Sequence, residues 1–189
     1  MEKTSVKGPF PTMVKRFLAF LLALSITVFI FLFREHLAGY EKYGYLGVFL
    51  VNLLGSGTVI LPVPALLVVF AVGGVRSWNP LIVGLAGGLG SALGELTGYL
   101  LGYSGQGLIE NQALYKRMEG WMKRNGFLTI LILSIIPNPA FDIAGMAAGA
   151  LRFPLRLFLL SAFIGKSVKM IALAYAGFYS LPLVERFIR

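Results

Sequence analysis

The chain has 189 residues, of which 57% are apolar and only 13% charged, and its mean hydropathy is +0.80. Soluble domains carry about 45–50% apolar and ~25% charged residues, so the composition excludes a soluble fold and predicts a single membrane domain over residues 1–189. The absence of cysteine and the single histidine exclude a disulfide framework and a zinc site, and the net charge of +9 indicates cytoplasmic loops and anionic lipid rather than nucleic acid.

The first apolar run, residues 17–33, follows four basic residues: Lys3, Lys7, Lys15 and Arg16. A cleaved signal peptide is the alternative to a retained span. The run is longer than the roughly 7–15 residues of a signal-peptide core, and no small-residue cleavage site follows it. We therefore predict a first span over 17–33 with a cytoplasmic N-terminus.

The second apolar run, residues 45–74, is long enough for one crossing and too short for two. The segment GSGTVILPVP, residues 55–64, interrupts it, and prolines lack the N–H group that continues a helix. Each arm has about 10–18 residues, against ~20 for a crossing. The pattern predicts a re-entrant hairpin whose tip backbone comes from Gly55, Gly57, Pro62 and Pro64.

A full-length span is predicted over residues 80–102, with Pro80 suited to its first turn. Four glycines recur at every fourth position and predict a face for close helix packing: Gly90, Gly94, Gly98 and Gly102. The stripe beside them is small and polar and includes Ser91, Glu95 and Tyr99. The alternative for the carboxylate is a structural ion pair with Lys166 or Lys169.

Residues 107–125 place apolar and charged side chains on different helical faces. This pattern, together with Trp121, predicts an amphipathic helix at the membrane interface. A plain solvated helical linker is the alternative.

The fourth apolar run, residues 127–151, contains the segment SIIPNPAFDIAG. Pro137 and Pro139 deprive two carbonyls of helical partners, and the arms of about 10–12 residues predict a second re-entrant hairpin. Asn138 fits a helix N-cap, and Asp142, the only aspartate of the chain, falls in the following first turn. A cap and a dipole partner without further function are the alternative for these two residues.

A last span is predicted over residues 153–181, and it carries Lys166 and Lys169 at membrane depth. A hairpin followed by a span occurs twice, so we predict an all-α integral membrane protein with two re-entrant hairpins arranged as an inverted repeat. Charges at membrane depth are costly and indicate a lipid or proton pathway. The candidate residues are Glu95, Asp142, Lys166, Asn138, Lys169, Ser91 and Tyr99.

The segment Pro137-Asn138-Pro139-Ala140-Phe141-Asp142-Ile143-Ala144-Gly145 resembles the PNPxFDxAG pattern of the vacuole membrane protein branch of the DedA superfamily. Ile164-Gly165-Lys166 and, more weakly, Leu54-Gly55-Ser56-Gly57 are similar to the same branch. The glycine-rich segment from Gly94 to Gly102 resembles the superfamily's GDxxGYxxGR, with Glu95 for Asp and Tyr103 for Arg. The resemblance covers about residues 40–180.

The resemblance implies paired re-entrant hairpins and the movement of lipids between leaflets. Eukaryotic members scramble phospholipids, and bacterial members are linked to undecaprenyl phosphate recycling with proton coupling. Bacterial carriers often have an acidic residue where Ala65 stands, and arginines near the second tip, where this chain has Ser134 and Asn138 and no arginine before Arg152. These departures favour scrambling over a proton-coupled carrier.

We therefore expect a lipid translocase or scramblase that moves phospholipid or polyprenyl phosphate without ATP. The alternatives are a proton-coupled transporter of a lipid phosphate, ion or small solute, and a non-transporting membrane assembly factor. We expect no enzymatic activity, no catalytic residue, no cofactor and no metal, and membrane lipids as partners; a homo-oligomer is left open. The short chain predicts a prokaryotic inner membrane protein.

Overall fold

The computed structural model describes residues 41–57, 62–105, 112–136 and 140–188, and within these ranges it is helical without strands. The predicted first span, 17–33, lies outside the described residues. The helices are α2 (Glu41–Gly57), α3 (Pro62–Gly73), α4 (Pro80–Gly94), α5 (Leu96–Tyr103), α6 (Gln112–Ile135), α7 (Ala140–Ala150) and α8 (Leu155–Ile188).

Within the described residues, two helical segments are long and apolar enough to cross a membrane, Pro80–Tyr103 and Leu155–Ser180. The first comprises α4 and α5, which meet at Glu95 with little deviation from helical geometry (φ −68°, ψ −10°). The Asn79 side chain caps its start by accepting a hydrogen bond of 2.9 Å from the Leu81 N–H. At 1.5 Å per residue these segments are about 36 and 39 Å long, enough for a hydrocarbon core of ~30 Å.

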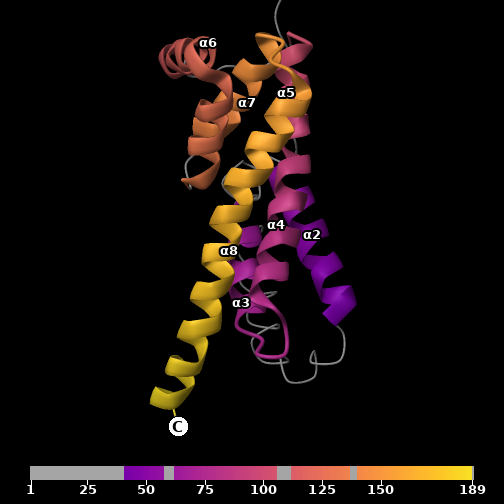
Figure 1. Cartoon of the computed structure of the whole chain (residues 1–189), viewed down its shortest axis with the longest axis vertical. Helices are drawn as coiled ribbons and strands as arrows, with labels where there is room; N and C mark the ends of the chain where they lie inside the picture. The colour runs from indigo at the N-terminus through magenta and orange to yellow at the C-terminus, as the bar shows by residue number, and fades with distance from the viewer. Residues whose placement is uncertain (1–40, 58–61, 106–111, 137–139, 189) are drawn as a thin grey trace, which may run out of the picture.

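The remaining helices form two pairs that pack against these long segments (Figure 1). Helices α2 and α3 contact each other, and they pack on α4 and α8. Helices α6 and α7 also contact each other; α7 packs on α5, and α6 packs on α8. In Figure 1 the first pair lies beside the lower half of the long helices and the second pair beside the upper half.

Helix α6 joins two elements that the sequence analysis treats separately. It begins at Gln112 and continues to Ile135, but Asn125 has extended backbone angles (φ −156°, ψ 87°) that kink it. The Asn125 Oδ1 accepts a hydrogen bond of 3.1 Å from the Leu128 N–H and so caps the second part. The first part, predicted as an interfacial helix over 107–125, turns away from the long axis of the molecule (Figure 1).

The buried side chains form two apolar clusters at different heights. The lower cluster brings α2, α3, the start of α4 and the C-terminal half of α8 together around Val48, Val69, Val83, Met170 and Ala174. The upper cluster joins α5, α6, α7 and the N-terminal half of α8 around Tyr99, Ile130, Phe141, Phe158 and Ala162. Along α8, Lys166 and Ser167 lie between the two clusters and are buried.

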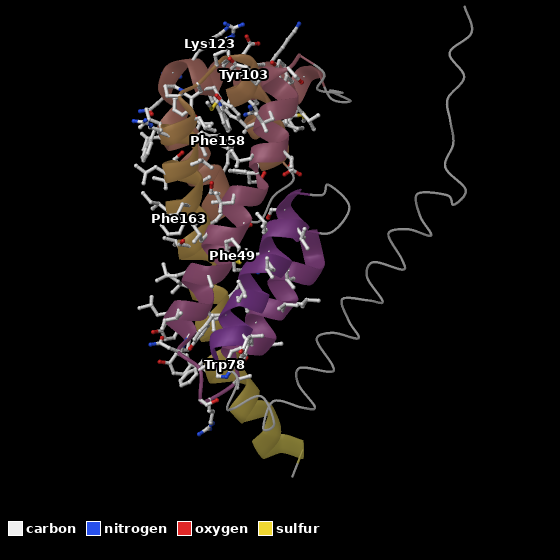
Figure 2. All side chains as sticks on the ribbon, turned by 90° about the vertical axis from the view of Figure 1, so that its right-hand side faces the viewer. Phe49, Trp78, Tyr103, Lys123, Phe158 and Phe163 are labelled. Atoms are coloured by element: carbon white, nitrogen blue, oxygen red, sulfur yellow. The ribbon has the colours of Figure 1, made fainter. Side chains whose placement is uncertain are left out.

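The outer surface is also apolar. The exposed large side chains of the long helices include Leu81, Ile82, Leu85, Leu89, Leu100, Leu101, Leu157, Leu160, Ile164 and Val168. Figure 2 shows side chains around the whole bundle, with Trp78 near one end and Lys123 and Tyr103 near the other. An apolar surface this extensive is expected where lipid rather than water surrounds the helices.

Candidate functional site

The strongest polar feature of the described fold is centred on the ammonium group of Lys166. Its Nζ forms an ion pair with the Glu95 carboxylate, and it donates a hydrogen bond of 3.2 Å to the Ser91 hydroxyl. Lys166 and Glu95 are each only 5% exposed. The contact therefore joins α8 to the junction of α4 and α5 through two buried and mutually neutralising charges.

Two further contacts extend this centre to both helix pairs. The Ser91 hydroxyl lies 2.5 Å from the hydroxyl of Ser56 on α2. On the other side, the Lys166 Nζ lies 4.6 Å from the ring centroid of Phe141 on α7, a cation–π contact. We name the group Ser56, Ser91, Glu95, Phe141 and Lys166 the polar centre; it joins elements from both helix pairs and both long helices.

The polar centre lies far from either end of the long helices. At 1.5 Å per residue, Lys166 is about 16 Å along α8 from Leu155 and ~21 Å from Ser180. By the same rise, Glu95 is about 22 Å from Pro80 and ~12 Å from Tyr103. These positions correspond to the interior of the bilayer when both helices cross it.

Asp142 and Lys169 are the more open members of the candidate set. The Asp142 residue is exposed and Lys169 is half-buried. Asp142 interacts electrostatically with both Lys166 and Lys169, and Glu95 interacts with the same two lysines. The structure thus divides the predicted charges into a closed pair, Glu95 and Lys166, and an open pair, Asp142 and Lys169.

Tyr99 belongs to the packing of the upper cluster rather than to the polar centre. Its hydroxyl donates a hydrogen bond of 2.6 Å to the Phe153 carbonyl, and its ring centroid lies 5.0 Å from that of Phe158. These contacts tie α5 to the turn before α8. The sequence analysis grouped Tyr99 with Ser91 and Glu95 because all three share a helical stripe. In the structure Tyr99 faces Phe153 and Phe158 instead of Lys166.

The four glycines of the predicted packing face contact different partners along the helix. An added Cβ at Gly90 would collide with the Phe49 carbonyl of α2, and one at Gly102 would collide with the Met146 carbonyl of α7. Gly98 is looser, with the Asp142 carbonyl oxygen 4.0 Å from such a Cβ, and Gly94 is buried. The glycine face thus passes from the first helix pair to the second.

Other close approaches were not anticipated from the sequence. Gly84 and Gly88 of α4 lie directly against Ile171 and Ser167 of α8, so a second glycine face supports the contact between the long helices. The spacing of these two glycines was visible in the sequence. Which helix each face contacts is set by the tertiary arrangement.

The predicted hairpin tips are described only in part. Gly55 is buried within α2, Gly57 is the last residue of that helix, and Pro62 and Pro64 lie in the first turn of α3. Proline is tolerated in a first turn because the N–H groups there have no helical partner. Pro137, Asn138 and Pro139 lie outside the described residues.

Two polar residues and one aromatic residue of this region were not singled out as site residues by sequence reasoning. Ser56 and Phe141 belong to the polar centre, and the buried Asn52 lies one turn before Ser56 and donates to the Val48 carbonyl at 2.9 Å. A polar residue inside an apolar run was the available signal for Asn52 and Ser56. Within the described part of the chain, no three His, Cys, Asp or Glu residues are grouped to hold a metal ion.

Comparison with known proteins shows which family the chain resembles. The VTT domain family model matches residues 61–179. The vacuole membrane proteins KMS2 and KMS1 of Arabidopsis thaliana are 48% identical over 42 residues and 36% identical over 56 residues. These segments are 22% and 28% of this chain and only 10% and 14% of the relatives' lengths. No solved structure matches. The family match spans more than half of the chain, both long helices and the polar centre apart from Ser56, and the chain therefore belongs to the VTT domain family of the DedA superfamily.

Proposed function

We propose that the protein moves lipids between the two leaflets of a membrane without ATP. The observation that carries this proposal is the polar centre, in which Lys166 contacts Glu95, Ser91 and Phe141 deep inside two membrane-length helices. A charge at the bilayer centre costs roughly 2.5–3.5 kcal/mol on insertion scales, so charged groups at that depth usually serve transport. The family match supports a role in membrane transport or lipid handling.

In this proposal the closed and open pairs have different roles. Glu95 and Lys166 neutralise each other and hold the helices together around the polar centre. Asp142 is exposed and Lys169 half-buried, so both are more accessible than the closed pair. A lipid headgroup that enters the membrane loses its hydrating water, and these two charges replace that water while the acyl chains stay in the bilayer. The lysine attracts a phosphate as a point charge, and the carboxylate keeps the binding weak enough for release.

ATP hydrolysis has no place in the proposal because the sequence lacks the GxxxxGK[ST] pattern. Gly165-Lys166-Ser167 matches only the end of that pattern, since Leu160 stands where its first glycine would be. The lysine is also buried in a helix and paired with Glu95 rather than presented at a glycine-rich turn. In this proposal the protein is not an enzyme, and its partners are membrane lipids.

We further propose that α2–α3 and the second part of α6 with α7 are re-entrant hairpins related as an inverted repeat. Helices α3 and α7 have 12 and 11 residues, so they reach about 18 and 16 Å against ~30 Å for a crossing. Six exposed basic residues occur at the end of the bundle where α6 begins and α8 starts: Lys116, Arg117, Lys123, Arg124, Arg152 and Arg156. The positive-inside rule makes this end cytoplasmic.

Single cysteines should test this topology, because the natural chain contains none. Tyr43, near the start of α2, and Ser77, between α3 and α4, are both exposed, and cysteines at these positions should react with an impermeant thiol reagent from one side of the membrane. A cysteine at Lys116 should react from the opposite side. A re-entrant hairpin returns to the side on which it started. Labelling of the Tyr43 and Ser77 positions from opposite sides would therefore rule out the first hairpin.

Lipid transfer itself is tested by reconstituting the purified protein into vesicles with a fluorescent phospholipid. Dithionite, which reaches only the outer leaflet, should bleach more than the outer-leaflet share of the label when the protein is present. The same experiment is done with several headgroups and with a labelled polyprenyl phosphate, with no nucleotide and no pH gradient. Bleaching equal to that of protein-free vesicles for every lipid would reject the proposal.

The presence of two carboxylates near two lysines favours one other function, a proton-coupled transporter of a lipid phosphate or small solute. Imposing a pH gradient in the same vesicles separates the two. A coupled transporter should move lipid only with the gradient, whereas the proposed activity should be equal with and without it.

A further inference from the structure

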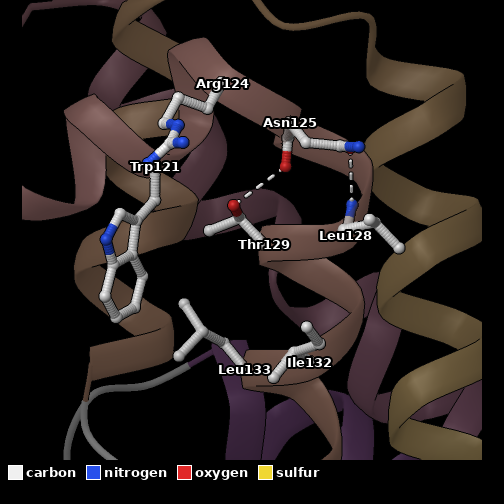
Figure 3. A pocket seen from close by; sticks show the side chains of 7 residues that line it. All are labelled: Trp121, Arg124, Asn125, Leu128, Thr129, Ile132 and Leu133. Atoms are coloured by element: carbon white, nitrogen blue, oxygen red, sulfur yellow. Dashed lines mark hydrogen bonds between the residues drawn. The ribbon is translucent and has the colours of Figure 1, made fainter.

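A groove lies on the outside of α6, at the kink produced by Asn125. It has a volume of about 320 Å³ and is lined by Trp121, Arg124, Asn125, Leu128, Thr129, Ile132 and Leu133. Figure 3 shows the Trp121 ring on one side of this groove, Asn125 and Leu128 on the other, and Ile132 and Leu133 below them. The volume falls in the ~300–1,000 Å³ range of small-molecule sites.

The groove has an apolar body and a polar rim. Leu128 and Ile132 are 47% and 53% exposed, so their side chains are available to an apolar ligand. The Thr129 hydroxyl donates to the Asn125 backbone carbonyl at 2.8 Å, and the Asn125 Oδ1 accepts from the Leu128 N–H, so these groups are engaged within α6. Arg124 carries the only charge among the residues that line the groove, and its guanidinium is the group suited to an external anion.

The basic side chains near the rim differ in whether they have a partner. Glu119 pairs with Lys123 at 2.7 Å, and the guanidinium of Arg117 lies 5.3 Å from the centroid of the Trp121 ring. Among the described residues, no carboxylate forms an ion pair with Arg124. The complementary ligand is therefore an anion that also carries an apolar chain.

The position of the groove selects a lipid among such ligands. The first part of α6 carries its basic residues at one end of the bundle and turns away from the long axis, whereas the second part runs beside α8. The groove spans the change of direction, with its rim toward the charged end and its apolar residues toward the membrane interior. A phospholipid in the adjacent leaflet likewise has its phosphate at the membrane surface and its acyl chains toward the interior, so it matches the groove from rim to apolar body.

We infer that this groove holds one anionic glycerophospholipid, with its phosphate at Arg124 and an acyl chain against Leu128 and Ile132. The site is separate from the polar centre, and its lipid is a bound resident of one leaflet rather than the lipid that is moved. Basic pockets beside membrane helices recognise anionic headgroups in this way. The inference does not depend on lipid transfer.

Quenching of Trp121 fluorescence by dibrominated acyl chains tests the inference directly. The full chain is reconstituted in phosphatidylcholine vesicles that contain an equal small fraction of either dibrominated phosphatidylglycerol or dibrominated phosphatidylcholine. The Trp121→Phe variant gives the contribution of Trp78, the only other tryptophan, which is subtracted. Dibrominated phosphatidylglycerol should have an apparent affinity about fivefold higher than that of dibrominated phosphatidylcholine, as expected for one basic residue near a membrane surface.

In Arg124→Gln the apparent affinities for dibrominated phosphatidylglycerol and dibrominated phosphatidylcholine should become about equal, because the charge that distinguishes the two lipids is gone. Lys116→Gln is the matched control, because it removes one exposed positive charge from the same part of α6 and does not line the groove; its preference should match that of the natural protein. Equal quenching by the two lipids in the natural protein would overturn the inference. So would a preference that survives Arg124→Gln, or one that Lys116→Gln abolishes equally, since the latter would reflect diffuse surface charge.

Discussion

Replacing Lys166 with methionine should lower the free energy of unfolding by about 3–5 kcal/mol, because it leaves the Glu95 carboxylate buried without its partner. The change also removes the hydrogen bond to Ser91 and the cation–π contact with Phe141. All three contacts join different helices, so the whole bundle should become less stable. Thermal unfolding of the purified protein in one detergent measures the effect, and the melting temperature should fall by on the order of 10 °C.

The double variant Glu95→Gln/Lys166→Met should recover much of this loss, since it removes both buried charges and keeps side chains of similar size. Lys123→Met is the matched control for the single change. It breaks the pair with Glu119, but Lys123 is exposed, and exposed pairs contribute only about 0–1 kcal/mol. If the melting temperature of the Lys166→Met protein equals that of the natural protein, the closed pair does not stabilise the fold.

The two long helices could be predicted from the sequence because a bilayer imposes a simple length requirement. The spans predicted over 80–102 and 153–181 correspond to the apolar segments Pro80–Tyr103 and Leu155–Ser180. Pro80 was informative for a different reason. The N–H groups in the first turn of a helix have no helical partner, so proline is tolerated there and marks the start of the span over 80–102. The family resemblance, found in the segment from Pro137 to Gly145, agrees with the VTT domain match.

The ion pair between Glu95 and Lys166 could be proposed from the sequence only as an alternative. Each residue was recognisable as a charge at membrane depth, and opposite charges at that depth are expected to pair. The partner could not be chosen between Lys166 and Lys169, because both lie near the middle of the same helix. The structure pairs Glu95 with Lys166 and leaves Lys169 half-buried near Asp142.

Other features depended on tertiary packing that local periodicity does not specify. Tyr99 shares a stripe with Glu95, yet its hydroxyl bonds to the Phe153 carbonyl. Asn125 was predicted as the end of the interfacial helix, and its backbone is not helical there (φ −156°, ψ 87°). The hydrogen bond by which its side chain caps the helix that follows could not be predicted. The contact of Lys166 with Phe141 required knowing which helices lie side by side.

Removing the charges of the open pair, Asp142 and Lys169, should have the second large effect, on lipid transfer. Asp142→Asn/Lys169→Met removes both accessible charges while leaving the Glu95–Lys166 pair in place. If these charges replace headgroup hydration during transfer, the rate of lipid movement should fall at least about tenfold, equivalent to ~1.4 kcal/mol of barrier. The melting temperature should change little, because neither residue is as deeply buried as the closed pair.

The measurement that tests the proposal most directly is therefore the rate of phospholipid transfer in vesicles containing this double variant. Glu119→Gln/Lys123→Met is the matched control, because it also removes one acidic and one basic residue, from an exposed pair outside the polar centre. We expect transfer to be reduced at least about tenfold in Asp142→Asn/Lys169→Met, and unchanged in the control, with both proteins folded. Transfer by a folded Asp142→Asn/Lys169→Met protein at the rate of the natural protein would contradict a lipid path along these charges.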